Sequence, residues 1–229
     1  MRDIEVICFD ADDTLWHNEP YFLEAQENFW RLMEDFLPAH ASRAELDRTE
    51  FQNIELYGYG IKAFILSMIE AAIEISDGHI TSKGITTIID YGKQMMDKPI
   101  ELLDGVPEVL EALHGTYRLV VATKGDLLDQ ERKLVKSGLS DYFHHIEIVS
   151  NKTEPEYRKL IGHLDIQPEQ FLMIGNSLRS DILPVLNVGG YAVHVPYHTT
   201  WAHEQIDFEI NHDHFHELPQ LAELPTLLK

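Results

Sequence analysis

Short runs of apolar, β-branched residues recur along the chain, and each run ends at polar or small residues. The first covers residues 4–9 and stops at Asp10. Four more runs share this character, at residues 117–122, 146–149, 171–174 and 191–195. Buried parallel strands have this nearly continuous apolar pattern, because both faces of such a sheet are covered. The pattern therefore predicts a parallel sheet.

Stretches with helical spacing of apolar residues separate these runs. They lie at residues 106–113, 127–137 and 156–164, and several are opened by Pro or Asp and closed near Gly. Strands and helices in alternation are typical of a doubly wound parallel sheet. We therefore predict an α/β fold with a Rossmann-like core.

The interval from about residue 21 to residue 96 breaks the alternation. Its candidate helices cover residues 22–36, 43–57, 61–75 and 85–96, separated by Pro38, Gly58, Gly60, Gly78 and Gly84. We expect a helical insertion over residues 17–97 and a core built from residues 1–16 and 98–229. A stripe of Phe64, Met68 and Ile75 is expected to form the core of the insertion.

The last part of the chain is expected to form a short edge strand at residues 208–210 and then a closing helix. His212, His214 and His216 alternate in this tail. No acid or cysteine shares a clear ligand spacing with them, so a solvated surface tail is favoured over a metal site.

The net charge of the chain disfavours some classes of binding partner. The chain has 18 Lys and Arg against 39 Asp and Glu, a formal net charge of -21 over 229 residues. Such a chain is repelled by nucleic-acid backbones and by anionic membrane surfaces. Hydrophobic residues make up 44% of the sequence, a content typical of a globular protein with a sizeable core.

Cysteine usage and the first residues bear on the compartment. Cys8 is the only cysteine and lies inside an apolar run, so we expect a small buried side chain and a reducing, cytoplasmic setting. The first five residues carry Asp3 and Glu5, which does not fit a secretory signal. The most apolar later stretch is interrupted by charged residues, so no membrane span is expected.

Polar residues that can do chemistry follow four of the predicted strands. The first strand is followed by Asp10-Ala11-Asp12-Asp13-Thr14, and the next one by Thr123-Lys124-Gly125-Asp126. Lys152 follows the third, and the fourth runs into Gly175-Asn176-Ser177-Leu178-Arg179-Ser180-Asp181. Each segment alone is explained by turns and helix caps. Ligands of open parallel sheets collect at the carboxyl ends of the strands, where these segments would meet.

In this order, the four segments resemble the four motifs of the haloacid dehalogenase-like hydrolase superfamily. The resemblance covers about residues 4–195, and the helical insertion looks like that superfamily's first type of cap. It implies that Asp10 is a nucleophile that forms an aspartyl-phosphate, and that Asp12 is the general acid and base. It also implies that Lys152, Thr123 and the N–H of Lys124 hold the transferred phosphoryl group.

The resemblance implies a Mg²⁺ ion as cofactor, bound by Asp10, by the backbone carbonyl of Asp12 and by the fourth segment. One residue departs from the family pattern, since Asn176 stands where Asp is common. The amide oxygen can still bind Mg²⁺ but removes one negative charge. We expect Asn176 to be a ligand, with Asp181 acting directly or through water and also orienting Lys152.

Asp12 separates branches of the superfamily, because dehalogenases and phosphonatases lack an acid at this position. We therefore expect a phosphatase that acts on a small phosphorylated metabolite, in preference to a dehalogenase, and no motif for a phosphomutase is evident. A second hypothesis, motivated by Asn176, is a catalytically reduced member that binds a ligand or partner without turnover.

Substrate selection is expected to fall to the insertion and to residues just after the first segment. Trp16 is expected to line the pocket. The turn Tyr57-Gly58-Tyr59-Gly60-Ile61-Lys62 fits an ordinary helix connection better than a substrate clamp. We expect a monomer or a homodimer, and the sequence does not decide between them.

Overall fold

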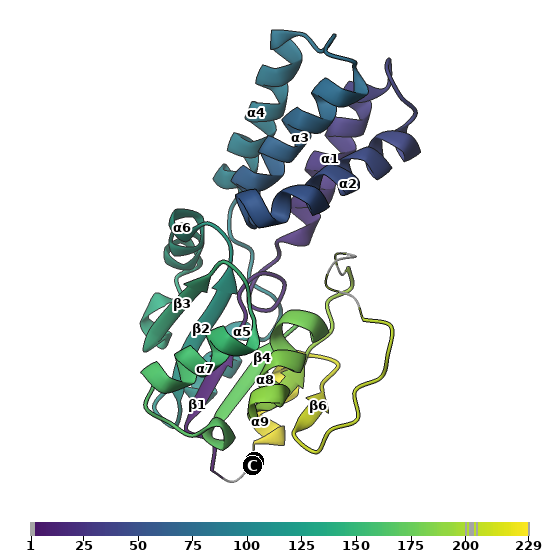
Figure 1. Ribbon diagram of the computed structural model, residues 1–229. Coiled ribbons are helices and arrows are strands. Elements are labelled where there is room, and N and C mark those ends of the chain that lie inside the picture. Colours follow the sequence, from purple (N-terminus) through teal and green to yellow (C-terminus); the bar gives the residue numbers. More distant parts are fainter. Residues whose placement is uncertain (1–2, 200, 202–203, 205, 229) are drawn as a thin grey trace. The chain divides into compact units, whose positions relative to one another are not determined.

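The computed structural model describes residues 3–199, 201, 204 and 206–228 (Figure 1). The chain divides into two compact units. The core unit comprises Met1–Glu19, Ile100–Lys124 and Gln130–Lys229, and the insertion unit comprises Pro20–Pro99 with Gly125–Asp129. The short second piece of the insertion unit covers the turn after the second strand and the first residues of the helix that follows, a position that the hydrophobic pattern does not reveal.

The core unit contains one parallel sheet. Its strands are β1 (Val6–Phe9), β2 (Arg118–Lys124), β3 (His145–Val149), β4 (Phe171–Gly175), β5 (Tyr191–His194) and β6 (Phe215–Glu217). Within the described residues the strand order is β3-β2-β1-β4-β5-β6, and every neighbouring pair is parallel. The predicted α/β class is therefore confirmed.

Alternate residues of the strands face two separate apolar clusters. In β1, Ile7 and Phe9 belong to one cluster, whereas Val6 and Cys8 belong to the other. Helices α5 (Val106–Leu113) and α9 (Leu224–Leu227) pack in the first cluster with Leu134 of α6 (Leu127–Ser137). Helices α7 (Glu154–His163) and α8 (Leu183–Val188) pack in the second. Both faces of β1 are thus buried, which explains its uninterrupted apolar run, and Cys8 is buried as expected.

The edge strand of the tail differs from the prediction. Residues 208–210 form no strand, and β6 is Phe215–Glu217 instead. Its residues pair with β5 from Ala192 to His194, so the partner strand determines which short segment is extended. Phe208 is exposed. His212 and His214 contact each other, and His214 stacks on Tyr191 of β5.

The insertion unit is helical throughout its described elements. Its helices are α1 (Glu19–Met33), α2 (Ala39–Tyr57), α3 (Ile61–Ile75) and α4 (Ser82–Asp97). Helix α3 has the predicted bounds, between Gly60 and Ser76. Phe64 and Met68 are buried in the unit's apolar cluster and Ile75 packs against it, which confirms the predicted stripe. Helix α4 begins earlier than expected, because the Thr81 hydroxyl caps it by accepting from the N–H of Gly84 at 3.1 Å.

The chain passes out of the core unit and back into it through two segments that lie side by side. The N–H of His17 donates to the carbonyl of Glu101 at 2.9 Å, and the N–H of Leu103 donates to that of Leu15 at 3.0 Å. Trp16 and Leu102 form an antiparallel bridge between these bonds. The two segments are therefore paired like a small hairpin within the core unit.

Candidate active site

The catalytic candidates lie where the strand order of the sheet reverses. The chain fills the sheet outward from β1 through β2 to β3 and then crosses to β4 on the other side of β1. Asp10 follows β1 and Asn176 follows β4, so both lie at the carboxyl ends of adjacent strands. Open parallel sheets bind ligands at this kind of switch point. The N–H of Asp10 donates to the carbonyl of Ile174 at 2.8 Å and extends the pairing to the site itself.

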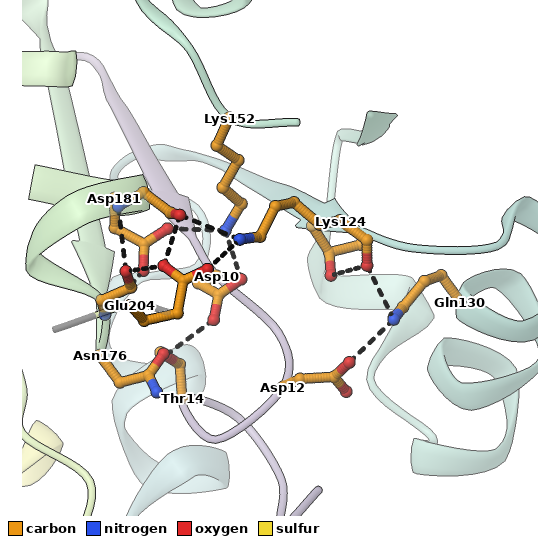
Figure 2. Close-up of polar contacts among 12 residues, drawn as sticks. Asp10, Asp12, Thr14, Lys124, Gln130, Lys152, Asn176, Asp181 and Glu204 are labelled. Carbon is orange, nitrogen blue, oxygen red and sulfur yellow. Dashed lines mark hydrogen bonds and ion pairs between the residues drawn. The ribbon is translucent and has the colours of Figure 1, made fainter. Parts of the chain in front are cut away.

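Lys152 joins the two buried carboxylates of the site (Figure 2). Its ammonium binds Oδ1 of Asp10 and lies 2.7 Å from Oδ1 of Asp181. Burial favours a neutral amine, but the two carboxylates outweigh burial and raise the pKa of Lys152. Burial raises the pKa of Asp10 to about 7; Lys152 opposes that shift and Asp181 adds to it. The arrangement places a fixed cation directly beside Asp10.

Asp181 has both carboxylate oxygens engaged by the protein. Oδ1 faces Lys152, and Oδ2 accepts from the N–H of Ser177 at 3.0 Å. The π-helical turn Leu178–Ile182 holds Asp181 there, and Ser177 caps this turn by accepting from the N–H of Ser180 at 2.9 Å. The sequence pattern alone predicted only a turn or a helix cap in this stretch. The geometry suits Asp181 to orienting Lys152, and its role as a direct metal ligand stays a prediction.

Asp10 and Asn176 direct oxygens toward one hydroxyl. Thr14 Oγ1 lies 3.2 Å from Oδ2 of Asp10 and 3.3 Å from Oδ1 of Asn176. A carboxylate oxygen and an amide oxygen that converge in this way are hard ligands of the kind that Mg²⁺ prefers. Among the described residues, no three His, Cys, Asp or Glu side chains form a group that could hold a metal. The donor set nevertheless fits Mg²⁺, since an amide and a backbone carbonyl are part of the expected set.

The Asp12 carboxylate points away from Asp10, toward α6 (Figure 2). Its oxygens accept from Nζ of Lys133 at 3.0 and 3.1 Å and from Nε2 of Gln130 at 2.8 Å. The indole Nε1 of Trp16 donates to Oδ1 at 2.7 Å. Asp12 is thus held by several donors on the side of α6 rather than at the nucleophile.

Trp16 occupies a different place from the one the sequence suggested. Its side chain is 1% exposed and belongs to the apolar cluster that includes Ile7 and Phe9 of β1. A ring with so little accessible surface has no face to offer a substrate, so the expected pocket lining by Trp16 lacks structural support. Its indole N–H positions Asp12 instead.

Asp13 shapes the loop that carries these residues. It has a positive φ of 62°, a conformation that Asp tolerates better than most residues. Its carboxylate accepts from the N–H groups of Asn18 and Glu19 and so caps the start of α1. Burial raises the pKa of Asp13 to about 7, while those N–H groups oppose the shift. The tight loop turns the chain from β1 toward α1.

Thr123 and Lys124 end β2 near the same cluster. Thr123 is 3% exposed. The Lys124 side chain runs to Ser180 Oγ at 2.9 Å and forms an ion pair with Glu204. The expected contact of Thr123 and of the Lys124 N–H with a phosphoryl group stays a prediction.

Glu204 is a part of the cluster that the sequence does not reveal. Its carboxylate accepts from the hydroxyl of Ser177 and, at 2.5 Å, from that of Ser180, besides binding Lys124. Burial would raise its pKa, but Lys124 and the two hydroxyls outweigh burial and lower the pKa of Glu204 to about 2. The carboxylate is therefore ionised across the physiological range.

Gln130, Lys133 and Glu204 belong to no motif, and two of them lie more than a hundred residues from their partner in the sequence. Gln130 and Lys133 are spaced three apart on one face of α6, which is the only sequence signal that links them. Gln130 and Lys133 reach Asp12 across 118 and 121 residues respectively, and Glu204 reaches Lys124 across 80. Only the folded chain brings them together.

Comparison with known proteins identifies the family of this chain. A family model described as haloacid dehalogenase-like hydrolase matches residues 4–189. A solved structure of a haloacid dehalogenase-like family hydrolase from Xanthomonas campestris is 36% identical, with a TM-score of 0.89, covering 99% of this chain and 91% of that one.

Two more distant relatives are informative: one is named for an enzymatic activity, and the other is described as bound to magnesium. A glyceraldehyde 3-phosphate phosphatase from Pyrococcus furiosus is 26% identical over 98% of this chain and 94% of its own length. A HAD hydrolase from Bacillus subtilis bound to magnesium has 18% identity and a TM-score of 0.68, covering 98% of each chain. At that identity the second likeness bears on the fold alone.

Proposed function

Because the chain belongs to the haloacid dehalogenase-like hydrolase family, we propose that it is a phosphatase that hydrolyses phosphate monoesters of small metabolites through an aspartyl-phosphate on Asp10. The observation that carries this proposal is the Asp10 carboxylate paired with the buried Lys152 at the switch point of the sheet. Curated relatives named as phosphatases support the same reaction class.

Asp10 acts first in the proposed mechanism. One of its carboxylate oxygens attacks phosphorus, a bond from that oxygen to phosphorus forms, and the bond from phosphorus to the ester oxygen breaks. Lys152 keeps the carboxylate in place and offsets the negative charge that the phosphoryl oxygens bring against it. Thr123 and the N–H of Lys124 hold those oxygens from β2.

Asp12 handles the proton. It gives a proton to the departing ester oxygen, and later it takes one from the water that attacks the aspartyl-phosphate, which releases phosphate and restores Asp10. To reach the leaving group, its side chain must turn from Lys133 and Gln130, which hold it in the described structure. Trp16 stays bonded to the same loop and fixes its backbone path.

The fitting cofactor is Mg²⁺, with Asp10, the carbonyl of Asp12 and Asn176 as its protein ligands. When bound, it supplies positive charge next to the phosphoryl oxygens. Asp181 contributes indirectly, since its two oxygens fix Lys152 and the N–H of Ser177.

The first substrate to test is glyceraldehyde 3-phosphate, because the relatives from Pyrococcus furiosus and Methanopyrus kandleri are named for that activity. The buried free thiol of Cys8 is consistent with the cytoplasm as the compartment of this protein. We expect the chain to work as a monomer or a homodimer.

Hydrolysis of p-nitrophenyl phosphate, with Mg²⁺ or with EDTA, tests the proposal. We expect turnover by the wild type only with Mg²⁺ and a loss of about a thousandfold or more in Asp10→Asn, because the nucleophile is gone. Asp104→Asn, which removes the same charge from an exposed position of the core unit, should retain full turnover. Equal turnover by Asp10→Asn and wild type would contradict the mechanism.

A catalytically reduced protein is the second candidate, and Asn176 is the observation that favours it. In that case the wild type would show no turnover, whereas Asn176→Asp would restore it by adding a negative charge at the metal site. For an active enzyme, Asn176→Asp should instead lower the Mg²⁺ concentration that gives half-maximal turnover.

A further inference from the structure

A short series of hydrogen bonds and ion pairs connects the Glu204 carboxylate to Asp10. Glu204 binds Ser177, whose N–H donates to Asp181 at 3.0 Å, and Asp181 shares Lys152 with Asp10. Figure 2 shows Glu204 beside Asp181 and Asp10, with the Lys124 ammonium directed into the same cluster. Glu204 is therefore connected to the nucleophile through Ser177, Asp181 and Lys152, although it has no direct contact with Asp10.

Both members of the Lys124 and Glu204 pair are mostly buried. Their side chains are 15% and 13% exposed, so solvent screens the pair only in part. Ser177 and Ser180 give the Glu204 carboxylate further donors and hold it in one orientation. A carboxylate held by one cation and two hydroxyl groups has a fixed position in the site, unlike a solvated charge on the surface.

Glu204 changes the charge that a ligand meets. With Lys124 and Lys152 opposed to Asp10, Asp181 and Glu204, the five side chains carry one net negative charge when all are ionised. Without Glu204 the other four side chains would carry no net charge. The Lys124 ammonium is directed into the cluster that contains Asp10, so this difference in charge falls near the proposed nucleophile.

We propose that Glu204 is a specificity-determining residue that selects against phosphate esters carrying a second anionic group, and so favours esters whose remaining part is uncharged. The inference rests on the proposed phosphatase function and narrows its substrate class. A substrate carboxylate near Lys124 meets a cation that Glu204 already offsets, and it is repelled by Glu204 itself. An aldehyde or hydroxyl group at the same place meets no such repulsion.

A matched pair of substrates tests the inference, because glyceraldehyde 3-phosphate and 3-phosphoglycerate differ only in an aldehyde against a carboxylate. We expect the wild type to have a kcat/KM about tenfold or more higher for the aldehyde. This first comparison needs no variant. A wild type that hydrolyses 3-phosphoglycerate as well as or better than the aldehyde would overturn the inference.

Two substitutions then isolate the charge. Glu204→Gln keeps the size and an accepting oxygen but removes the charge, so the preference for the aldehyde should shrink by about tenfold. Glu204→Asp keeps the charge and should keep the preference. Glu209→Gln, an exposed residue of the same tail, removes an equal charge and should leave the kcat/KM of both substrates unchanged.

The outcomes separate the inference from the function beneath it. If Glu204→Gln raises kcat/KM for both substrates by the same factor, Glu204 competes with the phosphoryl group itself, and selection against a second anion is wrong. If the wild type hydrolyses neither substrate nor p-nitrophenyl phosphate, the proposed phosphatase function fails first, and the inference fails with it.

Discussion

Gly175, at the end of β4, has no space for a side chain. A Cβ atom there would lie 2.2 Å from Oδ2 and 2.4 Å from Cγ of Asp181. Gly175→Ala must therefore push Asp181 away from Lys152 and from the Ser177 N–H. We expect a loss of stability of about 1–3 kcal/mol and a fall in phosphatase turnover of about a hundredfold. Urea denaturation and p-nitrophenyl phosphate hydrolysis measure the two effects.

Gly162 in α7 provides the matched control. A Cβ atom at Gly162 meets nothing within 4 Å, and its backbone is helical. Gly162→Ala should raise stability by about 0.5–1 kcal/mol, because alanine loses less backbone entropy in a helix. Turnover should not change. If the two alanine variants behave alike, the close approach of Gly175 and Asp181 is not a constraint on the site.

Among the residues of the site, the sequence predicts those that stand in motifs at strand ends. It misses those that reach the site from distant segments of the chain. Asp10, Lys152 and Asp181 stand in motifs at strand ends, and the structure brings them together. Glu204 has no motif and reaches Lys124 from a distant segment. The contacts that hold Asp12 on α6 depend in the same way on how α6 packs against the sheet.

Helix α3 carries much of the apolar core of the insertion unit. Met68 is completely buried there, whereas Leu66 on the same helix is 45% exposed. Met68→Ala should lower the free energy of unfolding by about 2–4 kcal/mol, because it leaves a cavity among packed side chains. Leu66→Ala should change it by less than about 1 kcal/mol. Equal losses in urea denaturation would mean that α3 is not packed on the Met68 face.

The elements themselves divide into two groups by how well the sequence predicts them. Helices α3, α5 and α6 have the predicted bounds, since their apolar spacing is regular and glycine or proline lies near their ends. Strands β1 and β4 are found at their predicted places because both of their faces are buried. The edge strand β6 is different: three residues hold too little pattern, and its pairing with β5 decides where it forms.

The excess of negative charge acts on the whole molecule. With 39 acidic and 18 basic residues, repulsion between like charges opposes the compact state. Raising NaCl shortens the screening length from about 30 Å at 0.01 M to about 3 Å at 1 M. We expect the free energy of unfolding to rise by about 1 kcal/mol at neutral pH, which corresponds to a rise in Tm of roughly 2–4 °C.

Thermal unfolding in EDTA, at the two salt concentrations, measures this gain without a contribution from divalent ions. Repeating it near pH 5 is the control, because protonation of carboxylates and of the 13 histidines brings the net charge closer to zero. The salt effect should shrink there. A salt effect of equal size at both pH values would mean that the stabilisation does not arise from repulsion between the protein's charges.

The pairing of residues 15–17 with 101–103 has a consequence for how such a chain can change over time. Since the backbone leaves and rejoins the core through adjacent, hydrogen-bonded segments, the core meets the whole stretch between them as it would meet one surface loop. The entropic cost of closing a loop rises only with the logarithm of its length. The stretch can therefore be lengthened, shortened or exchanged during evolution while the paired segments that join it to the core stay in place.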